Sequence, residues 1–296
     1  MPSLQAKIVH KILKLQAYGW AKGPVPEQRA RQEKLTGFIK IPPDVTVTPV
    51  NIKGISAELL DSKGAKNGVI LYLHGGAYAL GSVNVHREFL ARLAKSTRTG
   101  VLAINYRLAP EHPYPAALED ALTAFNWLIS QGYDPAKIVI AGDSAGGGLA
   151  IATLVSLRDQ GRLLPACAVC ISPWVDLSSA YEKEGKVDDP ILNAEILGMY
   201  ARYYTGEHNP QNPLISPIFA NLRGLPPLLI HAGTNEILLD QIKDFYDKAR
   251  QADIDITLET WPGLFHVFQI TPFLPESKLS LDKIADFIAE KLGKTA

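Results

Sequence analysis

The sequence has few of the features that mark disulfide-stabilised, membrane-spanning or nucleic-acid-binding proteins. Two cysteines among 296 residues are too few for a disulfide framework. The 30 Lys and Arg residues balance the 30 Asp and Glu residues, which leaves no basic surplus for nucleic acid. No apolar run reaches transmembrane length, and the start lacks a signal-peptide pattern. We therefore expect a cytoplasmic protein without nucleic-acid partners and without stable membrane insertion.

The two cysteines, Cys167 and Cys170, are spaced as in some redox and zinc motifs. They lie in an apolar segment typical of a strand, where side chains three positions apart point to opposite faces. Two thiolates also cannot complete a structural zinc site. We expect two buried structural cysteines, no metal site and no cofactor.

Strand-like and helix-like segments alternate along most of the chain. A hairpin over 45–60, with its turn at Lys53 and Gly54, comes first. The later strand-like segments are 69–73, 100–105, 138–141, 166–171, 228–231 and 254–260. The helix-like segments between and after them are 85–97, 116–130, 149–158, 191–205, 239–251 and 276–292. Such alternation predicts an α/β fold with a mostly parallel sheet covered on both faces.

Two segments stand apart from this alternation. Residues 3–20 have helical periodicity, with an apolar stripe of Leu4, Ile8, Ile12 and Leu15 beside three lysines. We favour a helix packed on its own protein, and a helix lying on a membrane surface is the alternative. A second short helix is expected over 27–35. The polar and aromatic stretch between Trp174 and Pro217 is typical of a lid or binding element.

One short segment combines a strand, a sharp turn and a helix around a serine. The apolar residues 138–141 run into Gly142-Asp-Ser-Ala-Gly146, and a helical run follows. Glycine at both ends lets strand and helix pass close together while the serine is held in a strained conformation. We predict that Ser144 is a nucleophile, supported by Asp143, and that the N–H of Ala145 can bind an anion. The alternative is a glycine-rich turn with an incidental serine.

A nucleophilic serine needs a base that accepts its proton and an acid that orients the base. In this architecture the chain order is serine, acid, histidine. His266 lies in a loop after a late strand and is the predicted general base. Glu236, in the loop after strand 228–231, is the predicted acid. Asp240 is the alternative acid, although its place at a helix start already gives it a structural role.

Acyl transfer also needs hydrogen-bond donors for the oxyanion. Gly75 and Gly76 directly follow strand 69–73 and can present unobstructed backbone N–H groups. With the N–H of Ala145 they form the predicted three-donor oxyanion hole. A flexible turn is the alternative explanation for the two glycines.

Together these segments resemble the hormone-sensitive-lipase-like esterases of the α/β-hydrolase superfamily. The resemblance spans about residues 45–295 and is carried by four motifs: His74-Gly-Gly-Ala77, the stretch 106–120, Gly142-Asp-Ser-Ala-Gly146, and Phe265-His266. It implies an α/β-hydrolase fold, with a central sheet of about eight strands and a helical cap. It also implies N-terminal cap helices in 1–40, an inserted cap segment in 175–215, and a catalytic domain formed by 41–174 and 216–296.

The resemblance implies a cofactor-independent serine carboxylesterase that hydrolyses short- to medium-chain acyl esters through a Ser-His-Glu triad and an acyl-enzyme. The sequence departs from the family at Glu236-Ile-Leu, where Asp-Pro-Leu is usual, and at Ala77, where Gly is frequent. An amidase or deacetylase on the same triad is one alternative. A non-catalytic small-molecule receptor is another, disfavoured because His266 is present. We expect a small-molecule ester as the binding partner. A homodimer is compatible with the sequence.

Overall fold

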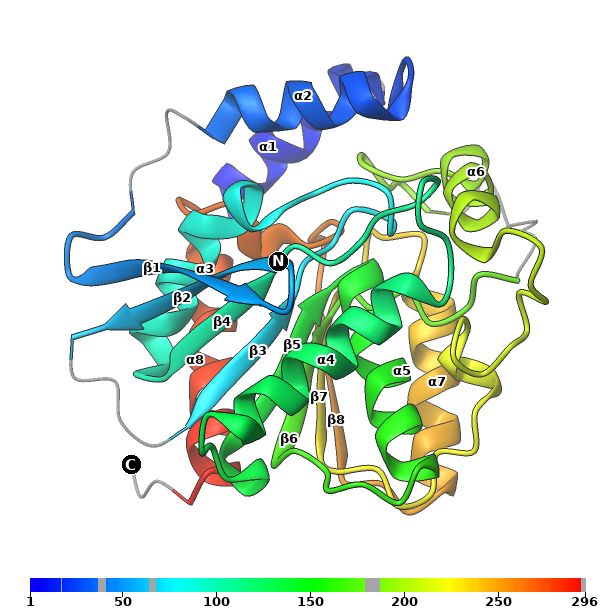
Figure 1. Cartoon of the computed structure of the whole chain (residues 1–296). Coiled ribbons are helices and arrows are strands. Elements are labelled where there is room, and N and C mark those ends of the chain that lie inside the picture. Colours follow the sequence, from blue (N-terminus) through cyan, green and yellow to red (C-terminus); the bar gives the residue numbers. More distant parts are fainter. Residues whose placement is uncertain (17, 37–40, 64–67, 179–186, 294–296) are drawn as a thin grey trace.

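The computed structural model describes residues 1–16, 18–36, 41–63, 68–178 and 187–293 (Figure 1). The chain starts with helices α1 (Leu4–Leu15) and α2 (Val25–Thr36), followed by strands β1 (Val45–Ile52) and β2 (Ile55–Ser62). The alternating part then contains β3 (Val69–Leu73), α3 (Val83–Thr97), β4 (Gly100–Ile104), α4 (Ala116–Ser130), β5 (Ile138–Asp143), α5 (Ala145–Asp159) and β6 (Cys167–Ile171). It ends with α6 (Ala194–Thr205), β7 (Leu228–Gly233), α7 (Leu239–Gln251), β8 (Ile256–Trp261) and α8 (Pro275–Lys291).

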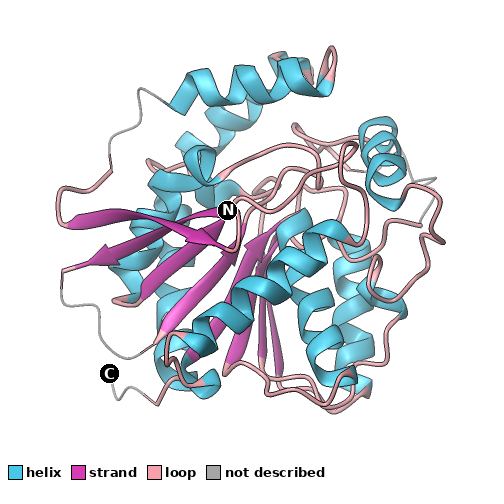
Figure 2. Cartoon of the chain, viewed as in Figure 1, coloured by secondary structure: helices cyan, strands magenta, loops and turns pink. Residues whose placement is uncertain are grey.

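The strands form one eight-stranded sheet in the order β1-β2-β4-β3-β5-β6-β7-β8 (Figure 2). Strand β2 is antiparallel to both of its neighbours, and the pairs from β4 to β8 are all parallel. The turn of the β1–β2 hairpin is Lys53-Gly54, and both residues have positive φ. The predicted α/β-hydrolase fold with a mostly parallel, eight-stranded sheet is confirmed.

Helices cover both faces of the sheet, as the continuous apolar strands predict. All residues of β3, β4, β5, β6 and β7 are buried. Leu71 and Ile140 pack in one core cluster with α4, α5 and α7, whereas Ile70 and Val139 pack in a second cluster with α3 and α8. Side chains therefore alternate between two cores along each strand.

The two cysteines follow this alternation. Cys170 belongs to the first core cluster and Cys167 to the second, and both are buried free thiols. Burial raises the pKa of each thiol to about 12. The prediction of buried structural cysteines is confirmed.

Helix α1 packs on the protein, but not through its most apolar stripe. It ends at Leu15, and a short 3₁₀ turn over Gly19–Ala21 follows, so the helix expected over 3–20 is interrupted. The inner face presents Ala6, Val9 and Leu13 to a small cluster that contains Phe265. The stripe of Leu4, Ile8, Ile12 and Leu15 is exposed.

Helices α1, α2 and α6 lie beyond the carboxyl ends of the parallel strands, where the cap was expected (Figure 1). The division into cap segments 1–40 and 175–215 stays a prediction, and residues 37–40 and 179–186 of those segments lie outside the described residues. Among the described helices, none has the length and apolar character needed to span a bilayer.

Candidate active site

Ser144 occupies the sharp turn between β5 and α5. Its φ of 53° and ψ of −120° lie in a strained region for a non-glycine residue. The turn is held because the Ser144 N–H donates to Ile171 O at 2.8 Å. A Cβ on Gly146 would lie 1.9 Å from Leu73 O, and one on Gly142 would lie 2.4 Å from Gly146 O. The close approach of strand and helix therefore requires both glycines of the motif.

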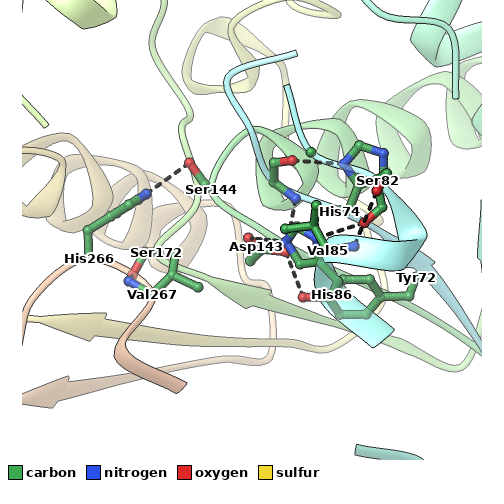
Figure 3. Close-up of polar contacts among 12 residues, drawn as sticks. Tyr72, His74, Ser82, Val85, His86, Asp143, Ser144, Ser172, His266 and Val267 are labelled. Atoms are coloured by element: carbon green, nitrogen blue, oxygen red, sulfur yellow. Dashed lines mark hydrogen bonds and ion pairs between the residues drawn. The ribbon is translucent and has the colours of Figure 1, made fainter. Parts of the chain in front are cut away.

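His266 lies within hydrogen-bond distance of both Ser144 and Glu236. Its Nε2 is 2.9 Å from Ser144 Oγ, and its Nδ1 is 2.9 Å from Glu236 Oε2 (Figure 3 shows the first contact). An ionised carboxylate can only accept, so Nδ1 carries a proton and Nε2 is free to accept one from the hydroxyl. The geometry is that of a nucleophile, a base and an orienting acid.

The acid beside His266 is Glu236 and not Asp240. Glu236 follows β7 and is completely buried. Asp240 is exposed in the first turn of α7, where a carboxylate interacts favourably with the helix dipole. Among the described contacts, the carboxylate that meets the imidazole is therefore that of Glu236.

The electrostatics of this pair favour a charged imidazole. Burial lowers the pKa of His266, but the hydrogen bond and charge of Glu236 outweigh burial, and the pKa is raised above 6.5. Burial also raises the pKa of Glu236, which His266 partly opposes. The site can therefore stabilise the imidazolium that forms when the serine loses its proton.

A second buried carboxylate, Asp189, supports the loop that carries Glu236. Asp189 is 5% exposed, and its Oδ2 accepts a hydrogen bond from the N–H of Ile237 at 2.9 Å. Its Oδ1 accepts from the N–H groups of Ile191 and Leu192 at 2.8 and 3.0 Å. Its negative charge also raises the pKa of His266. The sequence analysis missed this residue, whose only signal was its place in the inserted segment.

The predicted oxyanion hole needs one correction. The N–H of Gly75 donates to Asp143 Oδ1 at 3.0 Å, so it is not available to a substrate. Gly76 has a φ of +119° and Ala77 a φ of +53°, and within the described chain neither amide has an acceptor. The N–H of Ala145, at the first position of α5, has none either. The free donors are those of Gly76, Ala77 and Ala145.

Asp143 anchors this donor loop through a buried ion pair. Besides Gly75, it accepts from Tyr72 Oη at 2.7 Å and lies 3.3 Å from His86 Nε2 (Figure 3). His86 Nδ1 faces the carbonyl of Ser82 at 3.0 Å, so both ring nitrogens face acceptors and a protonated ring can donate to both. Burial disfavours this charge, but Asp143 outweighs it and raises the pKa of His86. The expected supporting role of Asp143 is consistent with these contacts.

The loop after β4 braces the same region. Arg107 is held by the buried Asp120 carboxylate at 2.8 Å. Glu111 pairs with Arg29 of α2 at 2.8 Å, and the Arg29 guanidinium also donates to the carbonyl oxygens of Ala79 and Ala109. These contacts hold α2 against the segment that follows Gly76 and Ala77.

Aromatic side chains hold α6 over the sharp turn that carries Ser144. Tyr204 of α6 stacks on Tyr78 with ring centroids 3.6 Å apart, and Tyr78 lies 6.3 Å from Trp174. The backbone N–H of Trp174 donates to the backbone carbonyl of Ser144 at 2.9 Å. Trp20, in the 3₁₀ turn after α1, stacks on Tyr200 of α6 with ring centroids 6.2 Å apart. The inserted segment is thus linked to the turn at Ser144 through packed rings and this backbone hydrogen bond.

No group of three or more metal-ligating side chains occurs in the part of the chain that the structure describes.

Comparisons with known proteins point in one direction. A family model described as α/β hydrolase fold matches residues 70–270. The chain is 38% identical to an acetyl-hydrolase of Streptomyces hygroscopicus, with 99% of each chain covered. It is 37% identical to an esterase of Acinetobacter venetianus, over 83% of this chain and 82% of that protein.

Solved structures give the same relationship. An esterase from the bacterial hormone-sensitive lipase family superposes with a TM-score of 0.92 at 38% identity, with 99% of each chain covered. The structure of EstE5 soaked with p-nitrophenyl butyrate also gives a TM-score of 0.92 at 38% identity, covering 98% of this chain and 99% of that one.

Proposed function

Because this chain belongs to the α/β-hydrolase fold family, among the bacterial hormone-sensitive-lipase esterases, and is a carboxylic ester hydrolase, we propose that it cleaves short- to medium-chain acyl esters through a Ser144–His266–Glu236 triad. The observation that carries the proposal is the pair of 2.9 Å contacts that join the three side chains. The retained histidine argues against a non-catalytic receptor.

The proposed reaction has two stages. His266 Nε2 accepts the proton of Ser144 as Oγ attacks the ester carbonyl, and the amides of Gly76, Ala77 and Ala145 stabilise the oxyanion. The imidazolium then protonates the departing alcohol and leaves an acyl-enzyme on Ser144. Water, deprotonated by His266, repeats the attack and releases the acid.

Glu236 stays ionised during both stages. Its carboxylate holds the Nδ1–H tautomer and stabilises the imidazolium. Losing a single oxyanion donor typically costs about 3 kcal/mol of transition-state stabilisation. The three free amides are therefore a substantial part of the proposed catalytic power.

Short acyl chains are supported by the surroundings of Ser144 and by two relatives. Ala77 places a methyl group on the donor loop, and the stacked Tyr78 and Tyr204 fill the space beneath α6. One relative is named an acetyl-hydrolase, and EstE5 was soaked with a butyrate ester. Acetyl to hexanoyl esters are the proposed range.

The test is hydrolysis of p-nitrophenyl esters from acetate to palmitate. We expect wild-type kcat/KM to be highest between acetate and hexanoate, and Ser144→Ala to lower kcat roughly 10⁴-fold or more. Ser130→Ala is the matched control, because Ser130 is exposed at the end of α4 and donates only to the Trp127 carbonyl. Wild-type turnover by Ser144→Ala would refute the triad, and a maximum at palmitate would refute the proposed substrate range.

Ester and amide bonds are distinguished by a second assay. A butyryl ester and a butyryl anilide that carry the same aryl ring are compared at equal concentration. We expect the ester to be cleaved much faster, since expulsion of a phenolate needs less proton transfer from His266 than expulsion of an arylamine. Faster cleavage of the anilide would make amide hydrolysis the better proposal.

A further inference from the structure

Helix α1 is apolar on two opposite faces, and only one of them is covered. Val9 and Leu13 pack against the cluster around Phe265, and Ala6 is 1% exposed. Half a turn away, the outer stripe is open to solvent, with exposed fractions of 71% at Leu4, 49% at Ile8, 49% at Ile12 and 85% at Leu15. These four residues share one side of the helix because they are spaced at three and four positions.

The charged side chains of α1 itself are all positive. Helix α1 contains three lysines and no acidic residue. Lys14 is paired with Asp188, which also contacts His10 at 3.0 Å. Lys7 and Lys11 are exposed and have no ion pair within the described residues. On a chain with a formal net charge of zero, this gives a local cationic flank along an apolar stripe.

Polar contacts at both ends of α1 fix the helix so that the outer stripe faces solvent. At the start of α1, Ser3 N donates to Glu276 Oε1 at 2.6 Å and Ser3 Oγ to Glu276 Oε2 at 2.9 Å. Near its end, His10 and Lys14 bind Asp188 of the inserted segment. Phe273 and Leu279, three positions on either side of Glu276, are exposed by 64% and 55%. The stripe is therefore a fixed surface feature and not a frayed end.

We propose that α1 docks the protein on an anionic lipid surface, with its outer stripe in the acyl-chain boundary and Lys7 and Lys11 against the headgroups. The helix has 12 residues and is about 18 Å long, so it fits along a membrane surface and does not cross it. Lipid acyl chains accept isolated leucine and isoleucine side chains without shape matching. Anionic headgroups provide the partners that the two unpaired lysines lack.

A second copy of the chain fits this surface less well. A stable protein interface buries about 800 Å² on each partner, more than four side chains of one short helix supply. In a two-fold dimer the same patch faces itself, so Lys7 and Lys11 would approach their own copies. Charge complementarity therefore favours lipid.

Docking in this manner would bring the active site to the lipid surface. The inner face of α1 packs on Phe265, the residue before His266, and His10 lies edge-on to the Phe265 ring at 6.5 Å. One helix diameter, about 10 Å, then separates the lipid from the loop that carries His266. The surface is thus suited to esters that partition into lipid.

The experiment is co-sedimentation of the full chain with vesicles, in the absence of any ester substrate. We expect binding to vesicles of equal parts phosphatidylglycerol and phosphatidylcholine, weaker binding to pure phosphatidylcholine, and loss of binding as salt is raised from about 0.05 M to about 0.5 M. Wild-type protein that stays in the supernatant with both vesicles would overturn the proposal. Because no turnover is measured, this result is independent of the proposed esterase mechanism.

Three variants locate the contact. Ile8→Gln with Ile12→Gln should lower the bound fraction at least 10-fold, and Lys7→Gln with Lys11→Gln should lower it on the anionic vesicles only. Leu163→Gln is the control, because Leu163 is 67% exposed and lies before β6, at the opposite end of the sheet. Circular dichroism checks that each variant is folded. If the isoleucine variant binds vesicles as well as wild type does, lipid is not the occupant of the stripe. The same holds if wild type sediments as a dimer in ultracentrifugation and the isoleucine variant sediments as a monomer.

Discussion

His266 connects a buried carboxylate to a nearly buried hydroxyl, and in the proposed mechanism its protonation state decides whether that hydroxyl can react. The imidazole accepts the Ser144 proton only while Nε2 is unprotonated. Glu236 and Asp189 both raise the pKa of His266, against the opposing effect of burial. The same charges that stabilise the imidazolium in the transition state therefore delay the onset of activity as pH rises.

The first prediction concerns this pH dependence. Activity should be low while His266 is protonated and should increase through a single ionisation whose midpoint lies above 6.5, the ordinary histidine value. The measurement is kcat/KM for a p-nitrophenyl ester at constant ionic strength, followed from acid to mildly basic pH. A constant rate across this range, or a midpoint well below 6.5, would contradict His266 as the base.

The second prediction separates the two candidate acids. Glu236→Gln keeps the size of the side chain but removes its charge, so we expect kcat to fall by about 10³- to 10⁴-fold. Asp240→Asn is the matched control and should stay within about twofold of wild type, since Asp240 is exposed on α7. Steady-state kinetics of both variants on one ester gives the answer. A larger loss in Asp240→Asn would reverse the assignment of the acid.

The residues that the sequence predicted and those that it missed differ in a physical way. Ser144, Glu236 and His266 sit after strands of a fold whose chain order fixes where the ends meet, so motif and order were sufficient. Which glycine amide is free could not be read from the sequence, because it depends on the φ of +119° at Gly76. Asp189 acts on a backbone N–H 48 positions away, a contact that no local pattern encodes.

At the scale of the element, the acid loop after β7 is tied to the inserted segment that precedes α6. Asp189 makes the connection with three backbone hydrogen bonds, one of which reaches Ile237. The loop that carries Glu236 is therefore hydrogen-bonded to a residue of the inserted segment. Asp189 acts through this loop and is a positioning residue.

The third prediction tests this connection. In Asp189→Asn the amide can no longer accept at both positions, and a negative charge near His266 is lost. We expect kcat to fall about 10-fold with little change in KM, and the midpoint of the pH profile to move to lower pH. Asp188→Asn is the control, because the Asp188 side chain is 57% exposed and, among the described residues, its ion pairs are with His10 and Lys14. An unshifted profile in Asp189→Asn would leave Asp189 with a purely structural role.

Elements themselves were predicted well where one periodicity dominates. The buried strands are continuous apolar runs between turn residues, and their observed bounds lie within a few residues of the expected ones. The side of helix α1 that packs on the protein was harder to predict, because apolar residues lie on two sides of this helix. The sequence singled out the stripe of large residues, but the smaller set of Ala6, Val9 and Leu13 packs on the protein. Residue size alone does not indicate which side finds a complementary surface.

At the scale of the whole molecule, the sheet also buries a histidine, His231, that has no part in the proposed reaction. His231 on β7 has no exposed surface, and burial lowers its pKa to about 3. Its Nδ1 lies 2.7 Å from Ser280 Oγ of α8, so the neutral ring joins the sheet to that helix. Folding keeps this histidine neutral at pH values where an unfolded chain would protonate it.

The fourth prediction is a pH-dependent loss of stability. Because the folded pKa of His231 is below the unfolded value, the unfolded state binds the proton first as pH falls below 6.5. Between pH 7 and pH 5 this one residue should lower the free energy of unfolding by about 2 kcal/mol. The measurement is urea unfolding of wild type and His231→Gln at both pH values. An equal pH dependence in the two proteins would contradict a neutral buried His231.

The central claim is that Ser144 is a nucleophile activated by His266, and covalent labelling with a fluorophosphonate tests it most directly. We predict one label per chain, located by mass spectrometry on the peptide that contains Ser144, absent in Ser144→Ala and slowed by several orders of magnitude in His266→Ala. A label on another residue, or ester hydrolysis by a protein that the reagent leaves unmodified, would contradict the account.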